Sequence, residues 1–115
     1  MKALNFYSSV YHGFLVCRDK RCTIRLGDKR GKYQEGEVVL VSYGDRYKKR
    51  RKVFTAVLDR VTVKRISELT EDEWRGEDPN LRSQQDVLEL LRRIYERPVD
   101  LDEVVSVIHF SEITD

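Results

Sequence analysis

Hydrophobic and polar residues alternate along much of the chain, and this pattern predicts strands separated by polar turns. Residues 38–43, with the sequence VVLVSY, form a β-branched run that is typical of a strand. Residues 21–26 and 53–66 alternate in the same way. The second segment has the length of one long strand or of two strands joined at a bulge. Residues 4–8 and 103–113 are also predicted to be strands.

Three other segments are predicted to be helical. Residues 9–18 are predicted to form an amphipathic helix that begins after a serine cap. Thr70, which is followed by three acidic residues, predicts a capped helical turn, because carboxylates are favoured at the positive end of a helix. Residues 83–95 form the clearest helix, with Ser83 as its cap. Its predicted core face consists of Val87, Leu88, Leu91, Ile94 and Tyr95.

The predicted order of elements is β–α–β–β–β–α–α–β. Strands outnumber helices, and they lie too close together in sequence for a doubly wound parallel sheet. The pattern therefore predicts an α+β fold, a small and mostly antiparallel β-barrel with two or three peripheral helices. A length of 115 residues is typical of one domain, so residues 1–115 are expected to form a single unit.

Composition narrows the classes of function. No apolar run approaches the ~20 residues that span a bilayer, so no membrane partner is expected. The first residues lack the pattern of a signal peptide, which favours a cytoplasmic location. Cys17 and Cys22 are then expected to be reduced. Two cysteines and two histidines do not suffice for a typical structural zinc site at these spacings, so neither a metal nor a cofactor is predicted.

The distribution of charge points to a polyanionic partner. Residues 1–65 hold 17 Lys and Arg against 6 Asp and Glu, whereas residues 66–115 hold 5 against 14. Residues 46–52, with the sequence RYKKRRK, are either a solvated hairpin tip or a turn that follows a phosphate backbone. The candidate nucleic-acid-binding residues are Arg25, Lys29, Arg30, Lys32, Tyr47, Lys48, Lys49, Arg50 and Arg51.

Residues 20–25 read KRCTIR, and residues 33–38, at the end of a glycine-rich loop, read YQEGEV. This succession resembles the ASCH family, in which a helix leads to a K-x-x-T-x-R strand and then to a G-D/E turn. The agreement continues through the long strand at 53–65, the L-T-E segment at 69–71 and the last strand at 104–110. The resemblance implies a PUA-like barrel that receives RNA or a nucleobase beside the K-x-x-T-x-R strand.

Small members of that family include acetylcytidine amidohydrolases, and others are reported as ribonucleases. The resemblance implies a site built from Lys20, Thr23 and an acid, for which Glu77 fits best by position and Asp78 or Glu73 are alternatives. A lysine in a low-dielectric site loses its proton readily and can act as a base toward a hydroxyl nucleophile.

Plain structural roles are the alternative for each residue. Lys20 then lies in a solvated turn, Thr23 is a strand former and Arg25 pairs with a carboxylate. Trp74 either stacks on a base or closes a small core. We therefore expect an RNA- or nucleoside-binding domain, with an amidohydrolase or a ribonuclease as alternatives.

Overall fold

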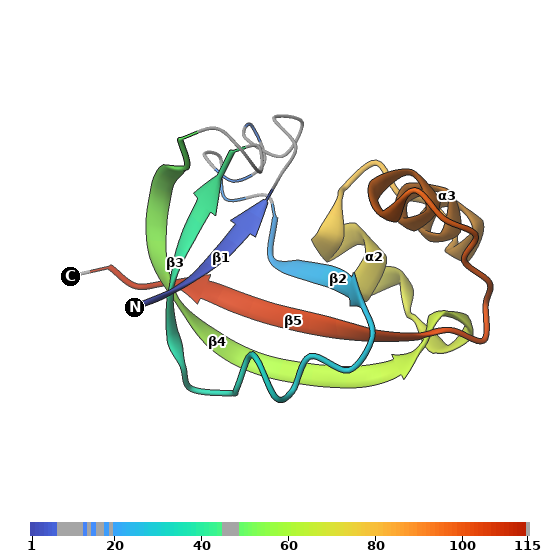
Figure 1. Cartoon of the computed structure of the whole chain (residues 1–115), viewed down its shortest axis with the longest axis horizontal. Helices are drawn as coiled ribbons and strands as arrows, with labels where there is room; N and C mark the ends of the chain where they lie inside the picture. Colours follow the sequence, from blue (N-terminus) through green and yellow to red (C-terminus); the bar gives the residue numbers. More distant parts are fainter. Residues whose placement is uncertain (7–12, 14, 16–17, 19, 45–48, 115) are drawn as a thin grey trace.

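A computed structural model gives the fold and describes residues 1–6, 13, 15, 18, 20–44 and 49–114. Within these residues the strands form one sheet (Figure 1). They are β1 (Lys2–Phe6), β2 (Cys22–Leu26), β3 (Val38–Tyr43), β4 (Arg51–Arg65) and β5 (Val104–Glu112). The helices whose bounds fall within the described ranges are the short 3-10 turn η1 (Ile66–Glu68), α2 (Glu71–Glu77) and α3 (Gln84–Tyr95).

The strand order in the sheet is β1-β3-β4-β5-β2, so β1 and β2 are its two edges. The pairs β3–β4, β4–β5 and β5–β2 are antiparallel, whereas β1 runs parallel to β3. The register shifts between Leu58 and Arg60 in β4, and an irregularity of this kind bends a strand. Strand β4 curves across the whole sheet, which forms a half-barrel (Figure 1).

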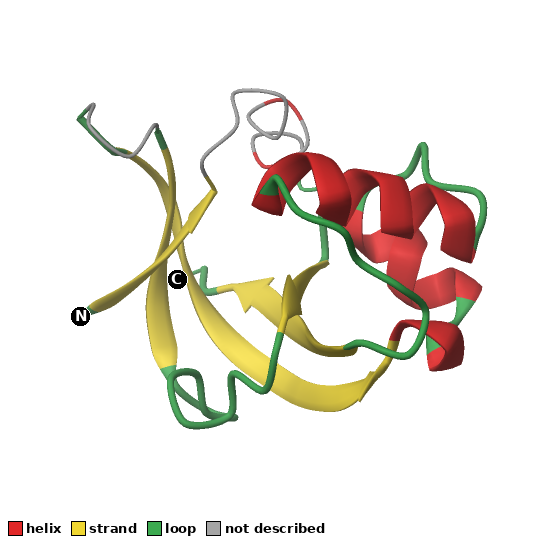
Figure 2. Cartoon of the chain, turned by 45° about the vertical axis from the view of Figure 1, so that its right-hand side comes forward, coloured by secondary structure: helices red, strands yellow, loops and turns green. Residues whose placement is uncertain are grey.

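Helices α2 and α3 lie together at one side of the sheet (Figure 2). Thr70 caps α2 through a capping box with Glu73, as the sequence predicts. Ser83 caps α3 by accepting a hydrogen bond from the Asp86 N–H. The Asp86 carboxylate accepts from the Arg82 N–H, so the reciprocal half of a capping box at this helix is absent from the described contacts.

Two clusters of buried apolar side chains form the core. One lies between the sheet and the helices and joins β2 and β5 to α3, with Ile24, Val107 and Leu91 among its members. The other lies on the opposite face, where Phe6, Leu58 and Phe110 belong to it. The helix-side cluster takes its strand residues from β2 and β5, whereas the other cluster takes them from β1, β3, β4 and β5.

The predicted α+β fold agrees with the structure, and so does the order of the elements that lie within the described residues, with some differences. The core face of α3 ends early, because Ile94 and Tyr95 are 46% and 37% exposed. Both belong to the last helical turn, and Leu90 is buried instead. The predicted helix at 9–18 lies mostly outside the described residues. Among the described residues, no helix is long and apolar enough to span a bilayer.

Candidate functional site

Lys20 and Glu77 form a buried ion pair beside the start of β2. The Lys20 Nζ lies 2.7 Å from the Glu77 Oε2 and donates a second hydrogen bond to the Glu77 carbonyl oxygen, also at 2.7 Å. The two side chains are 0% and 3% exposed. Of the three acids that the sequence left open, the structure places Glu77 against Lys20. Glu73 pairs instead with Lys64 at 2.9 Å, and Asp78 accepts from the Asn80 N–H.

The close approach of α2 to β2 holds Glu77 in place. Gly76 has its carbonyl bonded to the Arg21 N–H at 3.0 Å, and Glu77 Oε2 accepts the Ile24 N–H at 2.8 Å. The Cys22 thiol donates to the carbonyl oxygen of Glu73 at 3.2 Å. One carboxylate oxygen of Glu77 thus bonds both to the Lys20 ammonium and to a strand backbone, which fixes its position.

Burial lowers the pKa of Lys20 from its ordinary value, because desolvation disfavours the ammonium form. The Glu77 carboxylate acts in the opposite direction, and the neighbouring Arg25 cation lowers the pKa further. The Lys20 Nζ also lies 5.0 Å from the centre of the Phe6 ring. Lys20 is therefore an ammonium whose proton is more easily removed than that of a solvated lysine, and it is no solvated turn residue.

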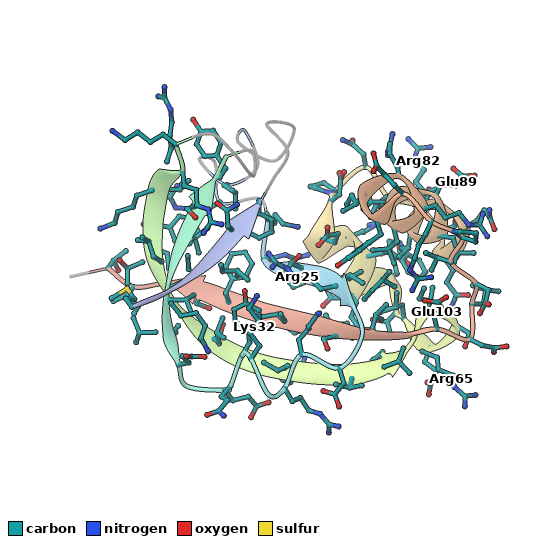
Figure 3. All side chains as sticks on the ribbon, in the orientation of Figure 1. Arg25, Lys32, Arg65, Arg82, Glu89 and Glu103 are labelled. Atoms are coloured by element: carbon teal, nitrogen blue, oxygen red, sulfur yellow. The ribbon has the colours of Figure 1, made fainter. Side chains whose placement is uncertain are left out.

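Arg25 connects β2 to the other edge of the sheet. Its guanidinium donates to the carbonyl oxygen of Asn5 at 2.9 Å and lies 5.3 Å from the centre of the Phe6 ring. No backbone hydrogen bond between β1 and β2 appears among the described residues, so side chains make this connection. We call the region formed by Asn5, Phe6, Lys20, Arg25 and Glu77 the β1–β2 junction. Figure 3 shows Arg25 between these strands.

Asn5 is a buried polar residue within β1, and both polar atoms of its side chain form hydrogen bonds. Its Oδ1 accepts from the Ser42 hydroxyl at 2.8 Å, and its Nδ2 donates to the Gly44 carbonyl oxygen at 3.3 Å. This network orients the backbone carbonyl that receives Arg25. Sequence analysis missed Asn5 and Ser42, although a polar residue between Leu4 and Phe6 in an apolar strand is a weak signal for such a role.

Thr23 is 3% exposed and lies on the same side of β2 as Arg25. Its partner in β5 is Ile108, which belongs to the core cluster away from the helices. Within the described part of the chain, the Thr23 hydroxyl makes no hydrogen bond, to Lys20 or to any other group. The structure therefore joins Lys20 with Glu77 but does not bring Thr23 into direct contact with them.

Other cations gather around Tyr33, a buried residue of the loop between β2 and β3. Lys2, Arg25 and Lys32 place their charged groups 5.4 to 5.8 Å from the centre of its ring. Arg30 is held by a salt bridge to Asp28 at 2.6 Å. Lys29 is half-buried, and its backbone N–H donates to the Ser106 hydroxyl.

The basic segment around residues 49–51 lies apart from the cations that surround Tyr33. Lys49 and Arg50 are exposed between β3 and β4, and Arg51 is the exposed first residue of β4. Tyr47 and Lys48 lie outside the described residues. The loop with Lys29, Arg30 and Lys32 precedes β3 and this one follows it, so the two occupy opposite ends of a strand of 6 residues. They do not form one continuous patch, because such a strand is about 20 Å long.

Trp74 packs against the helix-side core, which agrees with the core-closing role weighed for it. Its indole Nε1 is buried without a hydrogen-bond partner among the described residues. The same part of the chain holds no group of three or more His, Cys, Asp or Glu side chains that could bind a metal.

Comparison with known proteins rests on solved structures, since no family model and no curated protein matches the sequence. The ASCH domain from Lactobacillus crispatus JV V101 has a TM-score of 0.69 and 15% identity, over 94% of this chain and 77% of that chain. Hypothetical protein PH0355 has a TM-score of 0.66 and 20% identity, over 98% and 100%. Protein EF3133 from Enterococcus faecalis V583, with the family model DUF984, has a TM-score of 0.71 and 12% identity, over 98% and 80%. The chain therefore has the fold of an ASCH domain.

Proposed function

We propose that the chain binds RNA or a modified nucleoside at the β1–β2 junction. The observation that carries the proposal is the state of Arg25. Its guanidinium is held by the Asn5 carbonyl and the Phe6 ring, yet its other N–H groups have no hydrogen-bond partner among the described residues. An ordered, half-buried arginine with unused donors suits the edge of a base or a phosphate.

The surroundings of Arg25 support a negatively charged or carbonyl-rich ligand. Lys32 adds positive charge beside Tyr33, where Lys2 is paired with Glu37 at 3.0 Å, and Lys49 to Arg51 form an exposed basic segment at the other end of β3. Nucleic acids bind through such cations, with an affinity that falls as salt rises. The fold likeness to an ASCH domain and the sequence resemblance to the RNA-associated PUA-like group agree with this proposal.

The proposal is tested by titrating the protein with cytidine, acetylcytidine and single-stranded RNA and measuring each dissociation constant. Arg25→Gln removes the charge and the fork of donors. Arg65→Gln makes the same change at the exposed far end of β4 (Figure 3). Weaker binding in Arg25→Gln but not in Arg65→Gln would support the β1–β2 junction. Absence of binding to all three ligands by the unaltered protein would exclude the proposed function.

A second candidate is an amidohydrolase, and the buried Lys20–Glu77 pair favours it. In the proposed step, Lys20 in its neutral form accepts a proton from a nucleophilic water. The Thr23 hydroxyl could give this proton only after a rearrangement that brings it to Lys20, because the described residues show no bond between the two. The oxygen bonds to the amide carbonyl carbon, the C–N bond breaks and the proton passes to the leaving nitrogen. With water the products are a carboxylic acid and an amine. With Thr23 an ester forms first, and water then hydrolyses it.

The amidohydrolase candidate is tested by incubating the protein with acetylcytidine and measuring released cytidine by chromatography. Lys20→Gln with Glu77→Gln should abolish turnover. The matched control is Lys64→Gln with Glu73→Gln, which removes the other ion pair of α2. Thr23→Val distinguishes the nucleophiles, because turnover survives in this variant only if water attacks. Turnover that persists without Lys20 and Glu77 would rule out this mechanism. If the unaltered protein shows no turnover, the amidohydrolase candidate is excluded and only the binding function remains.

A further inference from the structure

A pocket of about 390 Å³ lies next to the Lys20–Glu77 pair, and sequence analysis did not single out its residues. Among the described residues its lining consists of Arg18, Arg21, Arg75 and Pro79. Two of these residues precede β2, one belongs to α2 and one follows it. The hydrogen bond from the Arg21 N–H to the Gly76 carbonyl oxygen, 3.0 Å long, holds the two walls together.

Three arginines line the pocket, each with a carboxylate partner, and two of these pairs are exposed to solvent. Arg21 lies 3.9 Å from Asp72, and Arg75 lies 2.8 Å from Glu71. All four of these side chains are more than half exposed, and exposed pairs of this kind contribute little to stability. The forks of Arg21 and Arg75 are therefore able to turn from these carboxylates toward another anion.

Arg18 has a different role in the pocket. Its guanidinium makes two hydrogen bonds to the Glu112 carboxylate, at 2.6 and 2.9 Å, and lies 4.5 Å from the centre of the Phe54 ring. A third bond joins it to the Leu15 carbonyl oxygen. Arg18 thus provides a positioned wall, whereas Arg21 and Arg75 are the side chains that can close on a ligand.

Residues of the pocket are close in sequence to the buried Lys20–Glu77 pair, both at the start of β2 and at the end of α2. Lys20 turns into the fold and has no exposed side-chain surface, while Arg21, the next residue, is 61% exposed. On the helix, Glu77 reaches Lys20, and Arg75 lies two residues earlier. A ligand would therefore present an anion to the exposed arginines, whereas Lys20 and Glu77, 0% and 3% exposed, offer it almost no surface.

We propose that this arginine pocket binds a phosphate group of the ligand whose base occupies the β1–β2 junction. The planar fork of arginine matches the geometry of phosphate, and the pocket is large enough for that group with part of a sugar. The inference rests on the proposed function and specifies it. The ligand is a nucleotide or an RNA strand rather than a free nucleoside or base.

The experiment compares cytidine, cytidine 5′-monophosphate and a single-stranded oligocytidylate by titration calorimetry. The variant is Arg21→Gln with Arg75→Gln, and the matched control is Arg65→Gln with Arg93→Gln, exposed arginines outside the pocket. We expect the monophosphate or the oligonucleotide to bind roughly tenfold more tightly than cytidine. The pocket variant should lose this advantage and keep its affinity for cytidine, while the control keeps both. A preference for the monophosphate indicates a terminal phosphate, and a preference for the oligonucleotide alone indicates a phosphodiester.

A second measurement separates failure of the pocket from failure of the proposed function. Inorganic phosphate is titrated into the protein while the side-chain Nε–H signals of Arg21 and Arg75 are followed by NMR. If these signals shift saturably but the protein binds no cytidine, monophosphate or oligonucleotide, the pocket is an anion site and the proposed nucleoside-binding function is excluded. Equal affinity for cytidine, monophosphate and oligonucleotide, without a phosphate-dependent shift, would overturn the pocket proposal even if cytidine binds.

Discussion

Gly76 lies so close to Cys22 that the Cys22 thiol occupies the space where any other residue at position 76 would place its Cβ atom. A Cβ atom at Gly76 would lie 2.8 Å from the Cys22 Sγ, well inside van der Waals contact. This approach lets α2 reach β2 and seats Glu77 against Lys20 and Ile24. The placement of the buried ion pair therefore depends on a glycine that contributes no group of its own.

Gly76→Ala should destabilise the fold by about 1–3 kcal/mol, because the added methyl group overpacks the contact with Cys22. Urea denaturation measures this change. Gly31→Ala is the control, because Gly31 is exposed and a Cβ there meets nothing within 4 Å. Adding Cys22→Ala to Gly76→Ala should recover part of the loss. A Gly76→Ala protein as stable as the unaltered chain would show that α2 can shift without cost.

Glu77→Gln should lower the free energy of unfolding by about 3–5 kcal/mol, because it leaves the Lys20 charge buried without its partner. The pKa of Lys20 should fall further, since the carboxylate that opposes desolvation is gone. Chemical denaturation compares this variant with Glu71→Gln, where an exposed carboxylate is lost and no change is expected. Lys20→Met with Glu77→Gln should be more stable than Glu77→Gln alone, because no unpaired charge remains.

Cys22 should resist thiol reagents in the folded protein, because burial raises the pKa of its thiol from 9.0 to about 12. Iodoacetamide labelling, followed by mass spectrometry in a Cys17→Ser background, should be slow at pH 8 and fast in urea. The raised pKa also implies a contribution to stability that is complete below pH 9 and is lost as pH rises toward 12. Rapid labelling under native conditions would contradict the packing of α2 on β2.

The lowered pKa of Glu73 predicts how the free energy of unfolding changes at acid pH. Burial opposes its charge, but hydrogen bonds from Lys64 and Thr70 outweigh burial and hold its pKa below 4.5. Its contribution is therefore present above pH 4.5 and is lost as pH falls through the lower folded value. Glu73→Gln should flatten the dependence of unfolding free energy on pH in that acid range. An unchanged profile would assign acid unfolding to other carboxylates.

Arg50→Ala with Arg51→Ala should weaken RNA binding without changing the affinity for a free nucleoside, because these exposed residues are not part of the β1–β2 junction. If both contact phosphates, the slope of log K against log salt should fall by roughly 1.4 for single strands. Fluorescence titrations at several salt concentrations give this slope. Equal loss of nucleoside affinity would instead indicate that the variant disturbs the fold.

The local elements were largely predictable because their signals are local. The β-branched run at 38–43 matches β3, and Thr70 and Ser83 cap the helices they were expected to begin. The parallel pairing of β1 with β3 was not predictable, since it joins residues far apart in sequence. The identity of the acid beside Lys20 depends on how closely α2 packs at Gly76, and no spacing in the sequence encodes that approach.

The positions of the basic residues were also not predictable from the sequence, because they depend on contacts between distant segments. From the sequence, Lys29, Arg30 and Lys32 stand in one set of candidate residues with the charged turn at 46–52, whereas in the structure β3 separates the two loops. Arg21 and Arg75 are far apart in the chain and were not connected at all. They share a pocket only because the β2 segment bonds to the end of α2.

The bond between Glu77 and the Ile24 N–H has a consequence for the edge of the sheet. An unpaired strand at the margin of a sheet is a template for pairing with a second chain, and β2 occupies that position. Here the Glu77 carboxylate takes the Ile24 N–H, and the Tyr95 hydroxyl takes the Leu26 N–H at 3.1 Å. The helices thereby occupy donors that an intermolecular strand would need. The carboxylate that holds Lys20 therefore also closes part of this edge to pairing with another strand.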